Sequence, residues 1–212
     1  MLPVGDAPAR HALADTYDRI ATHFAATRQH PWSDVCEFIE GSPPGARGLD
    51  IGCGNGRHLD VLGSVANSVV GLDLSQCLLA HAQDEQPHAF LVRGDAVELP
   101  FRTNVFDICL YVATLHHLPT RAERHASLAE VARVLKPDGR CLVSCWAVTH
   151  QQFDFEEGQD RWIDWTLPDG RTVPRFYHIF DPAEFTDELQ ASALAIEATW
   201  VSGGNCYAVG QG

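Results

Sequence analysis

Two carboxylates and three closely spaced glycines form the pattern in this chain that could do chemistry. Asp50 precedes Gly52, Gly54 and Gly56, which alternate with other residues after a short apolar segment. Glycine lets a backbone turn tightly and brings a bare main chain against a ligand. Asp73 ends the next apolar segment, where a carboxylate can hydrogen-bond the diol of a ribose. The spacing predicts a loop that binds a nucleoside.

The type of nucleoside follows from the same spacing. Dinucleotide sites prefer G-x-G-x-x-G, because a pyrophosphate lies on the N-terminus of the following helix. This chain has G-x-G-x-G instead, and Asp50 beside it would repel a pyrophosphate but suit a cationic amino-acid ligand. The pattern therefore favours S-adenosylmethionine (SAM), with S-adenosylhomocysteine (SAH) as the product of methyl transfer, over a dinucleotide such as NAD.

Further candidate residues follow later apolar segments. Asp95, with Ala96 beside it, is expected to hydrogen-bond the adenine amino group, with a turn-forming aspartate as the alternative. His116 is the better candidate to face the transferred methyl group, while His117 is expected to pack or to face solvent. Adjacent side chains point in different directions, so we expect no shared metal. The residues expected to bind the cofactor are Asp50, Gly52, Cys53, Gly54, Gly56, Asp73, Leu74, Asp95, Ala96 and Leu115.

Alternating strands and helices must position these residues. Apolar residues at helical spacing predict N-terminal helices over 11–41. Strands are expected at 48–51, 69–73, 89–93, 105–111 and 140–147, with helices at 57–62, 75–83 and 122–134 between them. A helix starting at Asp181 and a hairpin of strands at 195–202 and 206–209 close the chain. This order predicts an α/β, Rossmann-like, doubly wound seven-stranded sheet, mostly parallel, with a C-terminal antiparallel hairpin, in a single domain over 1–212.

Charge limits the classes of partner. The 212 residues carry a net charge of −13, and of the 15 lysines and arginines only Lys136 is a lysine. An acidic surface opposes indiscriminate binding of nucleic acid, so we expect no DNA partner. Excess acid with little lysine also suggests a halophile, adapted to a high-salt cytoplasm, with the arginine codons of a GC-rich genome as the alternative.

Localisation and cysteine chemistry follow from patterns that the sequence lacks. No run of about 18 apolar residues is present, and the first residues lack the basic and then apolar pattern of a secretory signal. We therefore expect a cytoplasmic protein with no membrane partner. The seven cysteines form no C-x-x-C pair and are expected to be buried reduced thiols, with a zinc or disulfide site as the alternative.

The segment 46–147 resembles the class I SAM-dependent methyltransferases, and the flanking segments narrow the resemblance. Before it stand Tyr17-Asp-Arg-Ile-Ala-Thr-His-Phe24, Thr27-Arg28 and Pro31-Trp32. After it stand Trp165-Thr-Leu-Pro-Asp-Gly170, Val173-Pro-Arg175-Phe-Tyr177-His178-Ile-Phe180 and Gly204-Asn205-Cys-Tyr207. Over about 17–210 the chain is similar to the tRNA wobble-uridine carboxymethyl methyltransferases, a family that includes a fungal tRNA enzyme and the methyltransferase domain of a vertebrate AlkB homologue.

The resemblance implies roles and partners. Arg28 would lie over the SAM carboxylate or near the substrate. The family usually carries two tyrosines before the last histidine of the motif, so Phe176 would remove one hydrogen bond to the acceptor. A small zinc-binding activator subunit docks on the edge strand in this family, here about 89–93, which implies a heterodimer acting on tRNA. The residues implied to be catalytic, with Arg28, are His116, Arg175, Tyr177 and His178.

The segment at about 148–180 and the reaction type leave alternatives open. Aromatic residues mixed with arginines suit stacking on an unstacked base, or else a cap that covers the core. A carboxymethyl acceptor is already ionised at pH 7, so His116 is expected to position it, whereas an amine or ring nitrogen would require proton handling. The other readings are an enzyme acting on a small molecule or protein, a SAM-binding regulatory subunit without turnover, and a Rossmann oxidoreductase. The aromatic residues of the segment include Phe153, Phe155, Trp162, Trp165, Phe176 and Tyr177.

Overall fold

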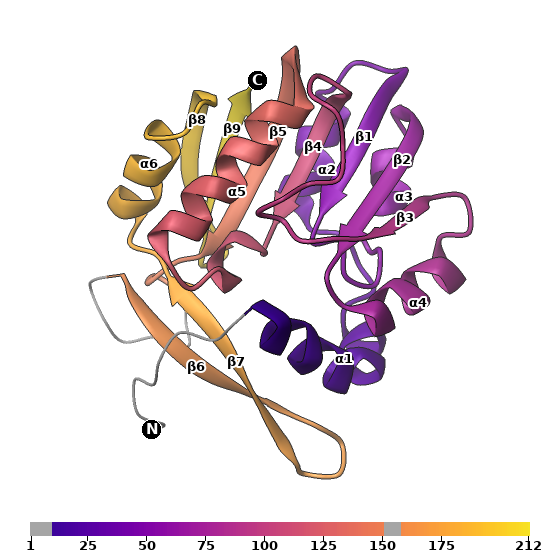
Figure 1. Ribbon diagram of the computed structural model, residues 1–212, viewed down its shortest axis with the longest axis vertical. Helices are drawn as coiled ribbons and strands as arrows, with labels where there is room; N and C mark the ends of the chain where they lie inside the picture. The colour runs from indigo at the N-terminus through magenta and orange to yellow at the C-terminus, as the bar shows by residue number, and fades with distance from the viewer. Residues whose placement is uncertain (1–9, 151–157) are drawn as a thin grey trace.

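One large sheet forms the centre of the molecule in the computed structural model, which describes residues 10–150 and 158–212 (Figure 1). Its strands are β1 (Ala46–Ile51), β2 (Ala66–Asp73), β3 (Phe90–Arg93), β4 (Phe106–Val112), β5 (Leu135–Trp146), β8 (Ala195–Ser202) and β9 (Asn205–Gln211). They lie in the order β3-β2-β1-β4-β5-β9-β8. Pairing is parallel from β3 through β5, and β9 is antiparallel to both of its neighbours.

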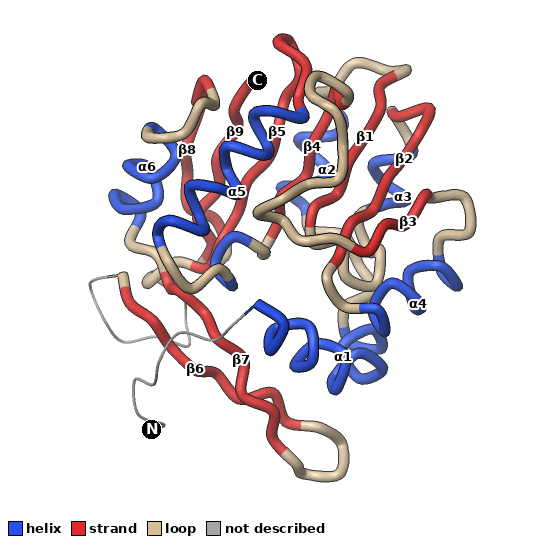
Figure 2. The backbone as a smooth tube through the Cα atoms, in the orientation of Figure 1, coloured by secondary structure: helices blue, strands red, loops and turns tan. Residues whose placement is uncertain are grey.

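Helices cover both faces of this sheet. α5 (Arg121–Val134) and α6 (Pro182–Gln190) lie on one face, and α2 (Ser33–Glu40) and α3 (Leu59–Gly63) lie on the other (Figure 1, Figure 2). Leu128 and Phe185 belong to one buried apolar cluster, and Ile39 and Leu62 to a second. The sheet thus has a hydrophobic core on each face, as a doubly wound fold requires.

Two elements lie across the carboxyl ends of the parallel strands. These are α1 (Arg10–Thr27) and a separate hairpin in which β6 (Gln159–Thr166) pairs with β7 (Thr172–Ile179) (Figure 1). The Asp18 carboxylate of α1 accepts hydrogen bonds from Ser75 and Cys77 at the start of α4 (Gln76–Glu85). In open α/β folds, ligands bind at this end of the sheet.

The predicted fold class is confirmed, including the one antiparallel strand of the terminal hairpin. The predicted starts of two helices, at Ser75 and Asp181, are confirmed as well. Ser75 caps α4 by accepting from the Leu78 N–H, and Asp181 caps α6 by accepting from the N–H groups of Ala183 and Glu184. These side-chain oxygens satisfy backbone donors that the first turn of a helix leaves unpaired.

Three predicted bounds were wrong. The strand expected from 69 begins three residues earlier, at Ala66. The helix expected at 57–62 begins only at Leu59, because Gly56 has a φ of +84°, which a right-handed helix does not allow, and Arg57 still lies in a turn. The strand expected from 140 begins at Leu135. An irregularity in the β4–β5 pairing takes up the intervening residues between the Leu135 and Arg140 partners. The segment at 148–180 contains the β6–β7 hairpin, and Phe153 and Phe155 lie outside the described residues.

Within residues 10–150 and 158–212, which the structure describes, no helix has both the length and the apolar character needed to cross a bilayer. All seven cysteines have free thiols; Cys77 is exposed and Cys36 is half-buried. The buried thiols are those of Cys53, Cys109, Cys141, Cys145 and Cys206.

Candidate active site

A cavity lies at the carboxyl ends of the parallel strands, beside α1 and the β6–β7 hairpin. Residues at or just after the end of each strand line it, which places side chains far apart in sequence around one space. Following the sheet from β3 to β4, the lining residues are Asp95 and Ala96, then Asp73 and Leu74, then Gly52, Cys53 and Gly54, and then His116 and His117.

The glycine loop after β1 runs close under the end of β2. The N–H groups of Gly52 and Cys53 both donate to the Leu72 carbonyl, at 2.7 and 3.0 Å. Gly52 has a φ of +73°, and a Cβ at this position would collide with the Thr114 side chain. Only glycine meets both demands. The loop is therefore fixed in a shape that presents its main chain to the cavity.

Asp73 holds this loop through its carboxylate. Oδ2 accepts from the Gly54 N–H at 2.8 Å, and Oδ1 accepts from the Ser75 N–H at 2.8 Å. Burial raises the pKa of Asp73, and these backbone hydrogen bonds oppose that rise. Each carboxylate oxygen can accept a second hydrogen bond. Asp73 can therefore hold the loop and bind a ligand hydroxyl at once.

Three residues expected to contact the cofactor do not line the cavity. Asp50 is 1% exposed beneath the loop. Burial raises its pKa to about 7, although the nearby Arg57 opposes the rise. Leu115 is fully buried in the core. A Cβ on Gly56 would face Leu59 and Ala82 rather than the cavity. Asp50 and Leu115 are thus buried in the protein, and Gly56 faces the core, so none of the three contacts a ligand in this cavity.

His116 and His117 both line the cavity, and His117 is buried there, which agrees with the packing alternative expected for it and not with the solvent-facing one. Both are buried, and their rings meet edge to face with centroids 4.5 Å apart. The short 3-10 helix η1 (Leu115–His117) turns the chain after β4, so consecutive side chains reach the same space. Burial lowers the pKa of His116 well below its usual range, and lowers that of His117 to about 3. Burial therefore favours the neutral form of both rings.

Arg28, Arg175 and Tyr177 also line the cavity, as expected. Arg175 is 6% exposed, donates from Nη1 to the Tyr177 hydroxyl, and leaves its Nε without a partner. The Tyr177 ring stacks on Trp146, with centroids 4.5 Å apart and an interplanar angle of 10°. It also lies 4.9 Å from the His116 ring. Tyr177 thus joins the arginine of β7 to the histidine after β4.

His178 does not line the cavity. Its ring nitrogens lie 2.7 Å from Asp160 and 2.9 Å from Glu184. Successive side chains of a strand point to opposite faces, so Arg175 and Tyr177 share one face of β7 while Phe176 and His178 share the other. Phe176 is also absent from the cavity and packs on Trp162. A hydroxyl at this position would therefore not have faced the cavity.

Comparisons with known proteins identify the family. Residues 49–143 match the family model described as a methyltransferase domain. A tRNA (carboxymethyluridine(34)-5-O)-methyltransferase of Schizosaccharomyces pombe is 30% identical over 203 residues, which covers 85% of this chain and 87% of that protein. The chain belongs to this family of SAM-dependent methyltransferases.

Other similar proteins share the name or the fold. A protein of the same name from Saccharomyces cerevisiae is 34% identical over 163 residues, covering 75% of this methyltransferase, and the chain spans 58% of that relative's length. A DhpI–SAH complex has a TM-score of 0.71 at 23% identity, with 95% of this chain and 97% of that chain covered. A complex of the Haloferax volcanii Trm112 methyltransferase activator with a methyltransferase has a TM-score of 0.70 at 17% identity, covering 94% of this chain and 96% of that chain. At these identities the structural likeness concerns the fold.

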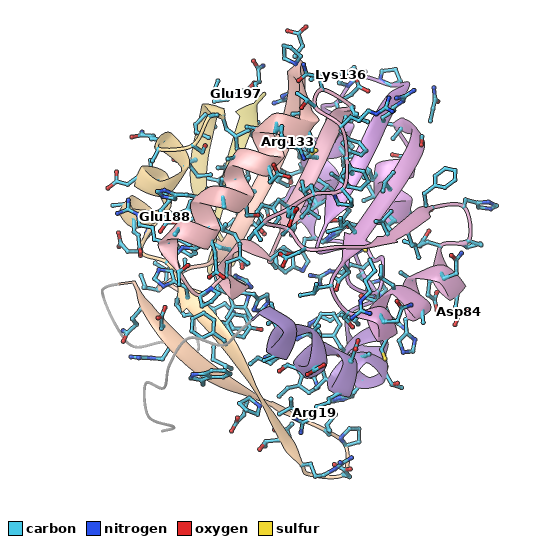
Figure 3. All side chains as sticks on the ribbon, in the orientation of Figure 1. Arg19, Asp84, Arg133, Lys136, Glu188 and Glu197 are labelled. Carbon is cyan, nitrogen blue, oxygen red and sulfur yellow. The ribbon has the colours of Figure 1, made fainter. Side chains whose placement is uncertain are left out.

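Charge is divided along the methyltransferase cavity. Asp73 and Asp95 lie at the β2 and β3 side, whereas Arg28, Arg57 and Arg175 line other parts of it. The single lysine, Lys136, pairs with Asp107 at 2.6 Å and lies at the opposite end of the sheet from α1 (Figure 3). In a strongly acidic protein, several arginines around one space indicate an anionic ligand there.

Sequence reasoning missed several residues that line the cavity. Arg57 was expected in a helix, Trp146 in a strand, and Tyr17 in the N-terminal helices over 11–41. Trp146 ends β5, so the rule that ligands bind at the carboxyl ends of strands could have found it. Tyr17 reaches the cavity only because α1 folds back over the sheet, a tertiary feature with no local signal.

Proposed function

We propose that this SAM-dependent methyltransferase methylates a carboxylate on tRNA, the carboxymethyl group of a wobble uridine. The observation that carries the proposal is the buried Arg175 guanidinium, joined through Tyr177 to the neutral ring of His116 in one cavity. A guanidinium binds a carboxylate through paired hydrogen bonds. The neutral ring of His116 adds a donor at Nε2, because its acceptor nitrogen, Nδ1, is already occupied by the Trp146 N–H. Two of the relatives, which match 75% and 85% of the chain, carry the name of this reaction.

The cavity residues suit SAM laid across the strand ends. Asp95 would accept from the adenine amino group, and Asp73 has lone pairs left for the ribose hydroxyls. The bare main chain of the glycine loop would lie along the amino-acid part. Arg28, whose guanidinium lies on the cavity wall, would bind its carboxylate. With SAM bound in this orientation, its methyl-bearing sulfonium would lie toward His116, which follows β4.

The residues of this chain would act mainly by alignment. Bound SAM supplies an electrophilic methyl group on a sulfonium. A carboxylate acceptor is ionised at neutral pH and has no proton to lose. Arg175 would bind this carboxylate, and His116 would orient it. The stacked rings of Trp146 and Tyr177 would exclude water from the reacting groups.

The experiment that tests the acceptor supplies methyl-labelled SAM to total tRNA, to a protein extract and to a metabolite pool. We expect label in tRNA, released by mild base because a methyl ester hydrolyses where an N-methyl group does not. The Asp73→Ala variant serves as the control for SAM-dependent labelling. Label confined to protein or metabolites would overturn the tRNA assignment in favour of those acceptors. Absence of label despite SAM binding would favour a regulatory subunit.

The edge strand β3 supports the proposal of a heterodimer. Phe90 on β3 is 67% exposed, and an apolar edge strand is a template for pairing with another chain. We propose that a small zinc-binding activator docks here; a structural neighbour is a methyltransferase in complex with the activator Trm112. Phe90→Ser should weaken co-purification with such a subunit. Val201→Ser, at an apolar residue 44% exposed on the opposite edge strand, is the matched control. Equal effects of both changes, or a fully active monodisperse monomer, would overturn the proposal.

The acidic surface supports adaptation to a high-salt cytoplasm. At a net charge of −13, repulsion between carboxylates destabilises the compact state at low ionic strength, and salt screens it. Thermal melts in KCl from low to molar concentration should therefore show a rising Tm. A Tm that does not change with KCl would contradict adaptation to high salt and leave codon usage as the reason why the chain has only one lysine.

A further inference from the structure

The indole ring of Trp165 lies against two of the arginines that line the cavity. The Cζ atoms of Arg175 and Arg28 lie 4.7 and 5.2 Å from the centre of this ring. Trp165 itself is only 8% exposed and does not line the cavity, so it is too buried to stack on a substrate base. An aromatic ring at these distances attracts a guanidinium through its negative face. Trp165 therefore faces the two cations rather than the ligand.

The ring is held by both elements that cover the cavity. Its Nε1–H donates to Nδ1 of His23 in α1 at 3.0 Å. Trp165 on β6 pairs with Val173 on β7, and Arg175 stands two residues further along β7, so the two side chains share one face of the hairpin as diagonal neighbours. Ile20 of α1 and Val173 pack with the ring in a small apolar cluster. The indole is thus fixed independently of any ligand.

Both guanidinium groups keep donors for anions. The Nε of Arg175 is buried without a partner, which is costly unless a ligand satisfies it. Arg28 donates from Nη1 to the Thr27 carbonyl at 3.1 Å and leaves its other guanidinium nitrogens for the cavity. Two cations beside one ring repel each other, and an anion bound at each would relieve that repulsion.

We infer that Trp165 is a positioning residue that sets Arg28 for the carboxylate of SAM and Arg175 for the anionic group of the acceptor. The acceptor half rests on the proposed function, whereas the SAM half rests only on cofactor binding. The same ring contacts both arginines, so an anion bound to one arginine would fix the ring, and the fixed ring would hold the other arginine in place. Binding of SAM and binding of the acceptor would therefore be coupled.

The test compares SAH with its analogue that lacks the carboxylate, by calorimetry on the full chain. Trp165→Leu should raise the Kd for SAH about tenfold, which is in the range of a desolvated cation–π contact. The Kd for the analogue should change by less than about twofold. Trp165→Phe keeps a ring but loses the bond to His23, so it should show a smaller loss of the same selectivity. Trp162→Leu, a β6 position outside the cavity, is the matched control and should change neither affinity. Equal weakening of both ligands by either Trp165 variant would overturn the inference.

A double-mutant cycle separates positioning from general support of the fold. If Trp165 acts through Arg28, then Arg28→Gln and Trp165→Leu together should weaken SAH binding little more than Arg28→Gln alone. Additive losses would overturn the SAM half. For the acceptor half, Trp165→Leu should raise KM for tRNA more than it lowers kcat. Failure of the wild type to methylate tRNA would overturn the proposed function and the acceptor half, while the SAH comparison still decides the SAM half. Thermal melts confirm folding, and Trp165→Phe carries the test if Trp165→Leu does not fold.

Discussion

The backbone N–H of Trp146 donates to Nδ1 of His116 over 2.9 Å, which leaves the ring proton of His116 on Nε2. His117 has the opposite arrangement. Its Nδ1 lies 2.9 Å from the Phe176 carbonyl and must donate to it, so its Nε2 accepts from the Tyr17 hydroxyl at 2.8 Å. Two adjacent histidines in one cavity are thus fixed in different tautomers. Neither has a nitrogen placed to take a proton from an acceptor.

The pH profile of methyl transfer should reflect these neutral rings. Burial lowers the pKa of His116 well below its usual range and that of His117 to about 3, so neither ring changes charge between about pH 6 and pH 9. A carboxylate acceptor is ionised throughout. The value of kcat/KM for tRNA should therefore show no step from these residues. A step near pH 6.5 that disappears in His116→Gln would show that His116 acts as a base.

Removal of the His116 ring should separate transfer from cofactor binding. His116→Ala should lower kcat/KM roughly 10- to 100-fold, the range of one hydrogen bond to a charged group, because the acceptor loses its orienting donor. The Kd for SAH should stay within about twofold. His81→Ala on α4, outside the cavity, is the control and should leave both unchanged. Equal losses in transfer and in SAH affinity would assign His116 to the cofactor site.

Changes at Asp73 should act on cofactor binding. Asp73→Ala removes the acceptor for the N–H groups of Gly54 and Ser75 and for the ribose, so the Kd for SAH should rise roughly 100-fold. Asp73→Asn keeps one acceptor oxygen and should lose less. Calorimetry supplies both values, with NAD as a second ligand. Heat with NAD but none with SAH in the wild type would contradict the identification of the cofactor.

Local signals account for what the sequence predicted. Some features depend only on residues that are close in sequence, so a single sequence can reveal them. They include the positive φ of Gly52, the helix start at Ser75 and the alternation of the strands. His178 was misplaced because the register of β7 decides which face its side chain takes. The sequence left open whether Trp165 stacks on a base or covers the core, because composition does not show burial. Side chains brought to the cavity by α1, such as Tyr17, depend on tertiary packing.

The buried carboxyl of Asp50 should destabilise the apoprotein at alkaline pH. Burial raises its folded-state pKa to about 7, well above the unfolded value, so stability is lost as the pH rises from about 4 through 7. Asp50→Asn should therefore be more stable than the wild type at pH 8 by about 2–4 kcal/mol, and equal to it near pH 4. Chemical denaturation of both proteins at pH 4 and at pH 8 measures these free energies of unfolding. A less stable Asp50→Asn at pH 8 would show that the charge is needed, for which Arg57 is the nearby candidate partner.

His178 should stabilise the β6–β7 hairpin most at low pH. Burial and the nearby Arg124 oppose a charged ring, but the hydrogen bonds to Glu184 and Asp160 outweigh them and raise the pKa of His178. Because the pKa of His178 is higher in the folded than in the unfolded protein, the charged ring stabilises the fold fully below the unfolded-state pKa of about 6.5. This stabilisation is lost as the pH rises through the folded-state pKa. His178→Gln keeps hydrogen-bonding groups but carries no charge, so the Tm advantage of the wild type over this variant should be about 2–4 °C at pH 6 and should shrink by pH 9. The comparison within one pH cancels the contribution of Asp50, which both proteins share. A Tm difference that is constant across this range would mean that the ring is neutral and serves packing alone.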